Sequence, residues 1–332
     1  MSLFNLRNKN KYYNLLRKNV NIKKLRVLEW NDNSCYIDSV LFALFTFPCE
    51  FINKKMLFNR INHSPSLTKN EKNIRNILQK YIIKLVISIR HKHDIKDCSK
   101  FRKILSFCKL GGMPDFGQND QQEAGEFLLY LFTIFNINNL AKNRTITYVT
   151  NNLSKNVTKD ELVQSSISYD RKASPIIFID SFLLKNKLQK NNQIFYFLKQ
   201  FSDSGNLGKN NMVNHNKQLY KRRFSYVTYI DSPYIVFWAQ RADPITNCKI
   251  TTLITPTQKI TLQKGRVLYL NSIILHIGGI NTGHYIIYFK NNNKWYCYDD
   301  IKFNLVYIGN YFKMLDTTPC PKTNGVLYFY NE

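Results

Sequence analysis

The sequence predicts an α+β fold in which helical segments precede a mostly antiparallel sheet. Before about residue 145, apolar residues recur at helical spacing over 35–45, 74–89, 101–108 and 124–135. After that point, short runs rich in β-branched and aromatic residues alternate with polar loops. These runs are 176–184, 194–198, 234–238, 250–254, 267–276, 285–289, 295–298 and 326–330. Because helices and strands are separated along the chain, we expect the helices to pack against the sheet.

The first helical segment carries the strongest candidate for a reactive side chain. Ile37, Val40 and Leu44 mark its apolar face, and the polar run 31–34 before it suits a helix start. Cys35 is therefore expected at the N-terminus of a buried helix, where the helix dipole favours thiolate over thiol. The alternative interpretation is a buried structural cysteine.

The segment around the predicted helix 124–135 is acidic. Between Lys109 and Lys142 there is no basic residue, whereas Asp120, Glu123 and Glu126 all lie there. Asp120 and Glu123 have the spacing of a capping box for the helix over 124–135. The acids either cap that helix and are otherwise solvated, or they receive a cationic ligand, since carboxylates pair with guanidinium groups.

The composition is strongly basic. Lys and Arg number 48 against 22 Asp and Glu, which gives a net charge of +26 and a pI of about 9.7. Such a charge favours anionic partners such as nucleic acid or a membrane surface, although codon bias in an AT-rich genome is the simpler explanation. Basic residues are densest in residues 1–27, which we expect to form a solvated N-terminal arm, with weak nucleic-acid contact as the alternative.

The cysteines point to a reducing compartment. There are seven, scattered and without C-x-x-C spacing, so neither a disulfide framework nor a zinc ribbon is expected. No secretory signal and no apolar stretch long enough to cross a bilayer is evident. The sequence therefore predicts a soluble, cytoplasmic protein with no membrane span, which we expect to be a monomer. The scattered acids and histidines form no recognisable metal-ligand spacing, so no metal site is expected.

One histidine is placed to serve a cysteine nucleophile. Such a nucleophile needs a base and a third group that orients the base. His284 follows Gly283 at the start of a strand, and the next strand ends in Asp299 and Asp300. If the two strands form a hairpin, Asp299 returns beside His284, and the pair would face Cys35.

Three boxes, in this order, resemble those of the ubiquitin-specific proteases. They are NSCYIDS at Asn33–Ser39, QQEAGEFL at Gln121–Leu128, and GHY at Gly283–Tyr285 followed by WYCYDD at Trp295–Asp300. Two more segments agree: Pro233–Arg241 resembles the strand before that family's conserved arginine, and Val326–Tyr330 resembles its last strand. The resemblance extends from about Leu28 to Tyr330.

The resemblance implies a papain-like cysteine protease fold of thumb, palm and fingers. The catalytic domain would span residues 28–332, with a helical thumb over about 28–144 and fingers and palm over about 145–332. It implies thiol-dependent hydrolysis of the peptide or isopeptide bond after the C-terminal glycine of ubiquitin, without a cofactor. Cys35 would be the nucleophile, His284 the general base and acid, and Asp299 the orienting residue, with Asp300 as the alternative orienter.

Three departures from the family pattern affect the site. The run 31–34 lacks the family's glycine, so Asn31 and Asn33 are both candidates for stabilising the oxyanion. Asp38 stands where the family commonly has Asn, which is similar to the cylindromatosis-type branch. The C-x-x-C pairs of many family members are missing, so the fingers are expected to be reduced and free of zinc.

The resemblance also gives the acidic segment a function. The family's substrate ends in an arginine-containing tail, which Asp120, Glu123 and Glu126 would receive, with Tyr285 as a wall of the cleft. His276 matches a second histidine of the family and is expected to be structural.

Other functional classes remain open at this level. One is a catalytically impaired module that binds ubiquitin, and another is a basic protein associated with nucleic acid or a virion. A thiol protease for a SUMO-like modifier would use the same chemistry. The composition also favours a large DNA virus or another AT-rich genome as the source; if the source is viral, the enzyme would act in the host cytoplasm or the virion.

Overall fold

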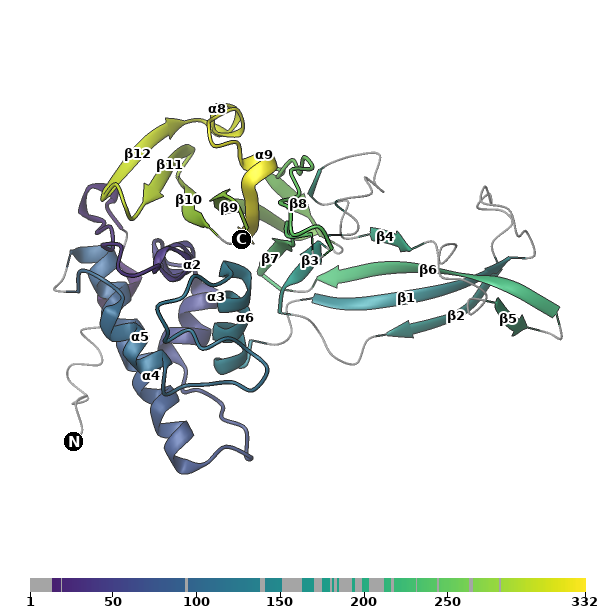
Figure 1. Ribbon diagram of the computed structural model, residues 1–332, viewed down its shortest axis with the longest axis horizontal. Coiled ribbons are helices and arrows are strands. Elements are labelled where there is room, and N and C mark those ends of the chain that lie inside the picture. The colour runs from purple at the N-terminus through teal and green to yellow at the C-terminus, as the bar shows by residue number, and fades with distance from the viewer. Residues whose placement is uncertain are drawn as a thin grey trace.

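The structure is a computed structural model of residues 1–332 (Figure 1). It describes residues 14–18, 20–92, 95–137, 175–179, 181, 184, 193–194, 232–243, 245–262, 265–280 and 282–332 in full. It describes the backbone of the strand segments 141–150, 163–169, 199–202, 212–215 and 218–230. The predictions from the sequence are therefore compared only with these residues. Of the predicted strand 194–198, residues 195–198 lie outside them.

Most of the described helices lie in the first part of the chain, as predicted, and two short helices that were not predicted follow near its C-terminal end. The helices are η1 (Ile22–Lys24), α2 (Cys35–Phe45), α3 (Glu50–Ile52), η2 (Asn53–Phe58), α4 (Lys69–His91), α5 (Ser99–Leu105), α6 (Ala124–Ile134), α8 (Tyr311–Leu315) and α9 (Pro321–Asn324). Among the residues that the structure describes, no single helix is long and apolar enough to span a membrane. Within these residues, only α2 together with Glu50–Phe58, a pair bent by 107°, has the length and composition for a broken span. α2 is buried in the core.

The strands form two sheets. The larger has the order β12-β11-β10-β9-β13-β7-β3, with β8 on β9, and is antiparallel except for β3 on β7. Its strands are β3 (Ile177–Ile179), β7 (Tyr234–Ala239), β8 (Lys259–Thr261), β9 (Val267–Gly278), β10 (Gly283–Asn291), β11 (Lys294–Asp299), β12 (Asn304–Gly309) and β13 (Gly325–Asn331). The predicted mostly antiparallel palm is confirmed.

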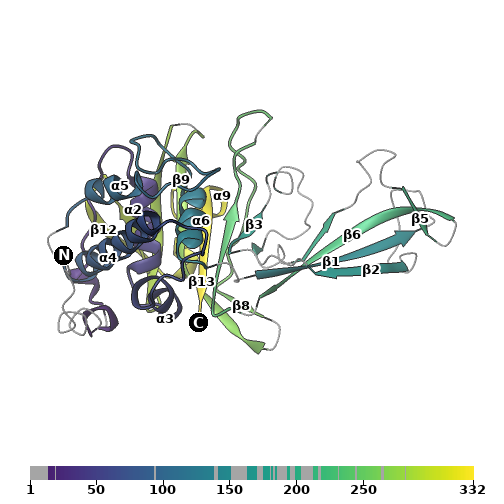
Figure 2. The same ribbon diagram turned by 90° about the horizontal axis from the view of Figure 1, so that it is seen from below.

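The smaller sheet extends away from the helices and the larger sheet (Figures 1 and 2). Its strands are β1 (Ala141–Thr150), β2 (Val163–Tyr169), β4 (Lys199–Ser202), β5 (Met212–His215) and β6 (Gln218–Ile230). It occupies the position predicted for the fingers. No cysteine lies between Cys108 and Cys248, so these strands contain no thiolate for a zinc site.

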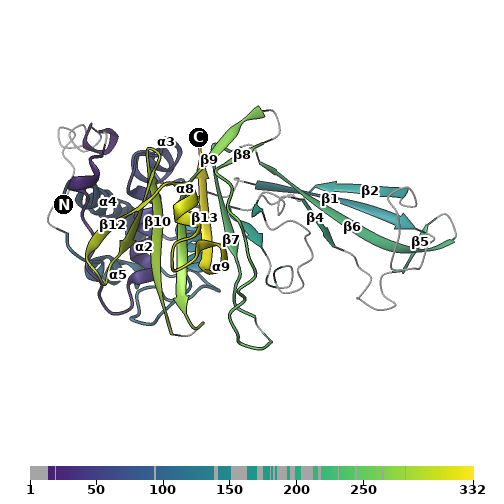
Figure 3. The ribbon, with the colours of Figure 1, turned by 90° about the horizontal axis from the view of Figure 1, so that it is seen from above.

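The larger sheet is buried on both faces because its strands alternate between two cores. In β7, Val236 and Trp238 face the core shared with the helices, whereas Ile235 and Phe237 face the opposite core. The helices of the thumb cover the first face (Figure 2), and α8 and α9 lie over the other (Figure 3). β10 and β11 therefore lie between two packed layers.

Two local predictions are wrong. Asp120 and Glu123 form no capping box, because the N-cap residue Glu123 makes no side-chain bond to the helix backbone and α6 begins at Ala124. Its carboxylate instead accepts from Trp238 Nε1 at 3.1 Å. Residues 250–254 form no strand, because the carbonyl groups of Ile250 and Thr252 accept hydrogen bonds from the buried Arg241 side chain, at 3.0 and 2.8 Å.

A buried arginine fixes the C-terminal end of α2. Arg90 in α4 is fully buried and donates from Nε to the carbonyl of Phe45 and from Nη1 to that of Leu16, both at 2.6 Å. Its Nη2 lies 3.3 Å from the carbonyl of Phe47. A cation at a helix C-terminus also complements the helix dipole. Arg90 therefore holds in place the helix whose other end carries Cys35.

Replacing Arg90 by Met should lower the free energy of unfolding by about 3 kcal/mol, because several buried carbonyl groups lose their donor. Urea unfolding followed by circular dichroism measures this change. Lys84→Met, at an exposed position of the same helix, is the matched control and should change it by less than about 0.5 kcal/mol. Equal, small effects of the two substitutions would contradict this role for Arg90.

Candidate active site

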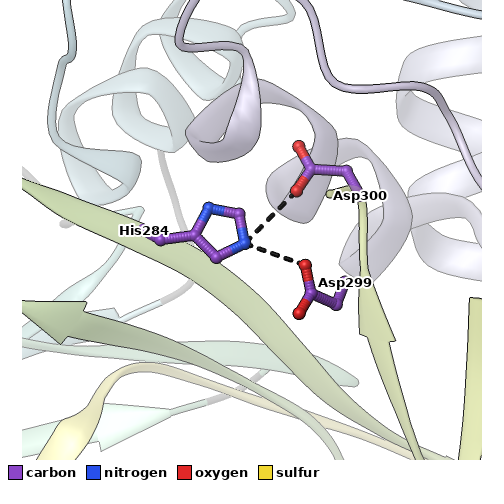
Figure 4. A group of neighbouring side chains, drawn as sticks. All are labelled: His284, Asp299 and Asp300. Carbon is purple, nitrogen blue, oxygen red and sulfur yellow. Dashed lines mark hydrogen bonds and ion pairs between the residues drawn. The ribbon is translucent and has the colours of Figure 1, made fainter. Parts of the chain in front are cut away.

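The predicted hairpin brings His284 and Asp299 together. β10 and β11 pair antiparallel, with Ile287 opposite Tyr298. His284 Nε2 lies 3.0 Å from Asp299 Oδ1, and the two side chains point toward each other (Figure 4). The backbone N–H of Ile301 donates to the same oxygen at 3.2 Å, which fixes the carboxylate.

The charge state of Asp299 suits an orienting residue. Burial raises its pKa, but the hydrogen bond and charge of His284, with Lys302 Nζ at 3.4 Å, outweigh burial and leave the pKa below its usual value. Asp299 is therefore ionised at neutral pH. As an acceptor for Nε2–H it selects the tautomer of His284 whose Nδ1 is free of a proton, and Nδ1 points away from both carboxyl groups (Figure 4).

Asp300 approaches the same nitrogen from the other side. Its Oδ1 lies 3.5 Å from His284 Nε2 (Figure 4), and its side chain is fully buried. Burial, with the nearby charge of Asp38, raises the pKa of Asp300 to about 9. The closer and ionised Asp299 is thus the better orienter of the two. His284, Asp299 and Asp300 offer atoms within 4.8 Å of one another, but a protonated Asp300 is a poor metal ligand.

Cys35 is the first residue of α2, as predicted, and is only 3% exposed. A hydrogen bond from the backbone of Tyr285, the residue after His284, reaches its sulfur. In the described part of the chain no hydrogen bond joins the Cys35 thiol to His284 itself. Such bonds are often long in unliganded enzymes and tighten when substrate binds.

The expectation of a thiolate is wrong for the unliganded protein. Burial raises the pKa of Cys35 from 9.0 to about 11, although the backbone of Tyr285 lowers it. Desolvation of the thiolate therefore outweighs the helix dipole. Cys35 therefore needs a base when it reacts. His284 is the candidate, because it directly precedes Tyr285, the β10 residue whose backbone contacts the sulfur of Cys35.

The loop before Cys35 is held by a residue that sequence reasoning missed. Arg102 in α5 is 3% exposed and donates from Nη1 to the carbonyl groups of Asn31, at 3.2 Å, and Asp32. Asp32 and Asn33 adopt positive φ angles of 44° and 61°, which Asn and Asp tolerate better than most residues. A basic residue within the apolar pattern of 101–108 was the available signal.

The two oxyanion candidates differ in their partners. Asn33 is exposed, and its Nδ2 donates to the carbonyl of Asn119 at 3.0 Å, away from Cys35. The backbone of Asn31 pairs with Ser34, whose Oγ accepts from Asn31 N at 3.0 Å. Because the Asn33 amide is engaged elsewhere, Asn31 is the better candidate.

A cleft of about 440 Å³ lies beside His284, and three of the four predicted substrate-binding residues line it. They are Glu123, Glu126 and Tyr285; Asp120 is exposed and does not contribute to the lining. Burial raises the pKa of Glu123 to about 7 and also raises that of the half-buried Glu126. A cation bound between these two acids would favour their ionised forms, in a cleft that the basic residues Arg241 and Lys249 also line.

The middle box also contacts the histidine strand directly. Gln121 Nε2 donates to the carbonyl of Gly283 at 2.9 Å, and its Oε1 lies 3.4 Å from Gly283 N. A side chain at Gly283 would collide with the ring of His276, whose Nε2 would lie 2.1 Å from the added carbon. Gly283 is required there, and Gln121 anchors it next to His284.

The surroundings of His276 favour the structural role predicted for it. Its ring lies 4.6 Å from that of Tyr285. Burial, with the charges of Lys249 and His284, lowers the pKa of His276 to about 4. It is therefore neutral at physiological pH. Because its pKa is so low, it binds a proton weakly and would be a poor catalytic base in place of His284.

Residues 28–330 match the family model described as ubiquitin carboxyl-terminal hydrolase. The chain belongs to this family. Two solved structures are similar: the Ubp8/Sgf11/Sus1/Sgf73 module of SAGA bound to monoubiquitin (TM-score 0.64, 14% identity, 100% of this chain and 75% of that one), and the same module bound to ubiquitin aldehyde (0.65, 13%, 100% and 76%). No curated protein matches. The ubiquitin hydrolase fold predicted from the three boxes is confirmed.

The raised pKa of Cys35 predicts how this ubiquitin hydrolase reacts with a small alkylating reagent. Without substrate, the rate at which iodoacetamide modifies Cys35 should still rise with pH above 9.0, because the thiolate fraction increases up to a pKa of about 11. Peptide mapping by mass spectrometry follows the rate, and the exposed Cys248 is an internal control for reagent access. A rate for Cys35 that is already constant at neutral pH would contradict the raised pKa.

Proposed function

We propose that Cys35, His284 and Asp299 form the catalytic triad of this deubiquitinating cysteine protease. The observation that carries the proposal is the 3.0 Å contact between Nε2 of His284 and the ionised carboxylate of Asp299. The residue after His284 in β10, Tyr285, contacts the sulfur of Cys35 through its backbone. The base, His284, would then lie between the nucleophile and the acid that orients it, as a cysteine protease requires.

The proposed reaction begins with proton transfer from the Cys35 thiol to Nδ1 of His284. The sulfur attacks the carbonyl carbon of ubiquitin's C-terminal glycine, and the oxyanion is stabilised by Asn31 and the backbone N–H of Cys35. His284 then gives the proton to the leaving amine, which departs as the C–N bond breaks. Water, deprotonated by His284, hydrolyses the thioester and restores the thiol.

The cleft beside His284 supports ubiquitin as the acyl donor. Its lining acids, Glu123 and Glu126, can form charge-assisted hydrogen bonds with the arginine-containing tail. Both similar solved structures contain bound ubiquitin, which supports the same partner here. The net charge of +26 also favours weak contact with nucleic acid, and we keep that contact, a monomeric state and a cytoplasmic location as predictions from composition.

Ubiquitin bearing a C-terminal electrophile should form a covalent adduct with the protein through Cys35. Intact mass spectrometry should show the added mass of ubiquitin in the unmodified sequence and none in Cys35→Ala. A SUMO probe of the same chemistry is the matched control for the modifier. An adduct with SUMO alone would change the substrate, and no adduct from folded protein would reject the proposed activity.

Replacing Glu126 by Gln should raise KM for ubiquitin substrates about tenfold, because loss of one charge-assisted hydrogen bond costs about 1.5–3 kcal/mol. The turnover number should change less, since Glu126 is not a member of the proposed triad. Steady-state kinetics on a ubiquitin C-terminal amide separates the two parameters. Asp120→Asn, outside the cleft lining, is the matched control, and equal KM values for both variants and the unmodified enzyme would reject this use of the cleft.

A further inference from the structure

Two buried carboxyl groups face each other behind the candidate triad. Asp38 lies in the first turn of α2 and Asp300 directly follows β11, and the exposed fraction of each residue is 0%. A side-chain hydrogen bond joins them. Because an ionised carboxylate can only accept hydrogen bonds, a bond between two carboxyl groups requires a proton on one of them.

The donors around Asp38 favour its ionised form. Ser34 Oγ donates to Asp38 Oδ2 at 2.5 Å, and Cys98 Sγ donates to Oδ1 at 2.8 Å. The side chain also lies in the first turn of a helix, where the dipole favours a negative charge. Burial raises the pKa of Asp38, but these donors and the charge of Arg102 hold it to about 6.

Asp300 has the opposite surroundings. Among the residues that the structure describes, no N–H group and no hydroxyl group donates a hydrogen bond to either of its oxygens, and both oxygens are buried. Burial and the charge of Asp38 raise its pKa to about 9. Asp300 is therefore the member that carries the proton and donates it toward Asp38.

We propose that Asp38 and Asp300 are a proton-sharing pair that positions Cys35 against His284 and reserves His284 for Asp299. The shared proton ties the end of β11 to the first turn of α2, which carries Cys35. Since Asp300 is neutral in this pair, it does not compete with Asp299 as the anionic partner of His284 Nε2. Both members are positioning residues, and their catalytic effect rests on the proposed function.

The pair gives the site a defined pH dependence. The titratable and charged groups around it are Cys35 on α2, Cys98 and Arg102 at α5, His284 on β10, and Tyr298 and Asp299 on β11. The pKa of Asp300 is raised in the folded state, so its protonated form contributes stability at low pH that is lost as pH rises through about 9. Above that pH, two buried carboxylates repel each other.

Infrared spectroscopy of the folded protein tests for the proton directly. Between a pH of about 7, where Glu123 titrates, and about 9, where Asp300 does, the unmodified protein should show the C=O band of a buried carboxylic acid. The band should vanish as pH rises further. It should persist in Glu123→Gln and be absent from Asp38→Asn, whose amide can donate to an ionised Asp300.

Kinetics tests the positioning role with the same variant. For each enzyme, kcat/KM is divided by its own value at neutral pH. One pH unit above the pKa of about 9, this ratio should be about tenfold lower for the unmodified enzyme than for Asp38→Asn, because about a tenth of Asp300 is still protonated there. Asp300→Asn, whose amide can donate to Asp38, is a second variant that removes the need for the proton if Asp38→Asn does not fold.

The outcomes separate this inference from the proposed function. Activity on ubiquitin without a carboxylic acid band in the unmodified protein would overturn the pair and leave the triad standing. A band without any ubiquitin hydrolase activity would support the pair and reject the triad. A band that persists in Asp38→Asn, or identical alkaline pH profiles for this variant and the unmodified enzyme, would overturn the proposal.

Discussion

The packing of α2 on the sheet is the contact on which the candidate site depends. The ring of Phe42 stacks on that of Tyr298, with centroids 4.0 Å apart, and meets Phe289 edge-on at 5.2 Å. Tyr298 immediately precedes Asp299, and Phe289 lies on the strand that begins beside His284. Each fully buried aromatic side chain contributes about 1.5–3 kcal/mol. The contact that stabilises the core therefore also sets the distance between nucleophile and base.

Burial controls the chemistry of the site as well as its geometry. A rise in the pKa of Cys35 from 9.0 to about 11 corresponds to about 3 kcal/mol against the thiolate. A helix N-terminus offers about 0.3–1 kcal/mol in return. The unliganded site accordingly keeps its protons on Cys35 and Asp300, and Asp299 is the acid that stays ionised, because His284 and Lys302 are close to it.

The middle box connects the thumb to the palm. Glu123 accepts from Trp238 in β7, and Gly125 lies so close to the same indole that an added Cβ would be 2.1 Å from its ring. The side-chain amide of Gln121 pairs with both the backbone carbonyl and the backbone N–H of Gly283. The acids of the cleft are thereby fixed relative to the histidine strand, although they belong to the helical half of the chain.

The sequence by itself determined the order of helices and strands, the start of α2 at Cys35 and the hairpin that joins His284 to Asp299. These features follow from periodicity and pairing between segments that are close along the chain. Only the tertiary structure decided that Glu123 accepts a hydrogen bond from Trp238 and does not cap the helix. The same is true of the contact of Arg102 with the loop at Asn31 and of Asp300 with Asp38. Burial and hydrogen-bond partners depend on segments far apart in sequence, and local patterns carry no information about which distant segments will meet.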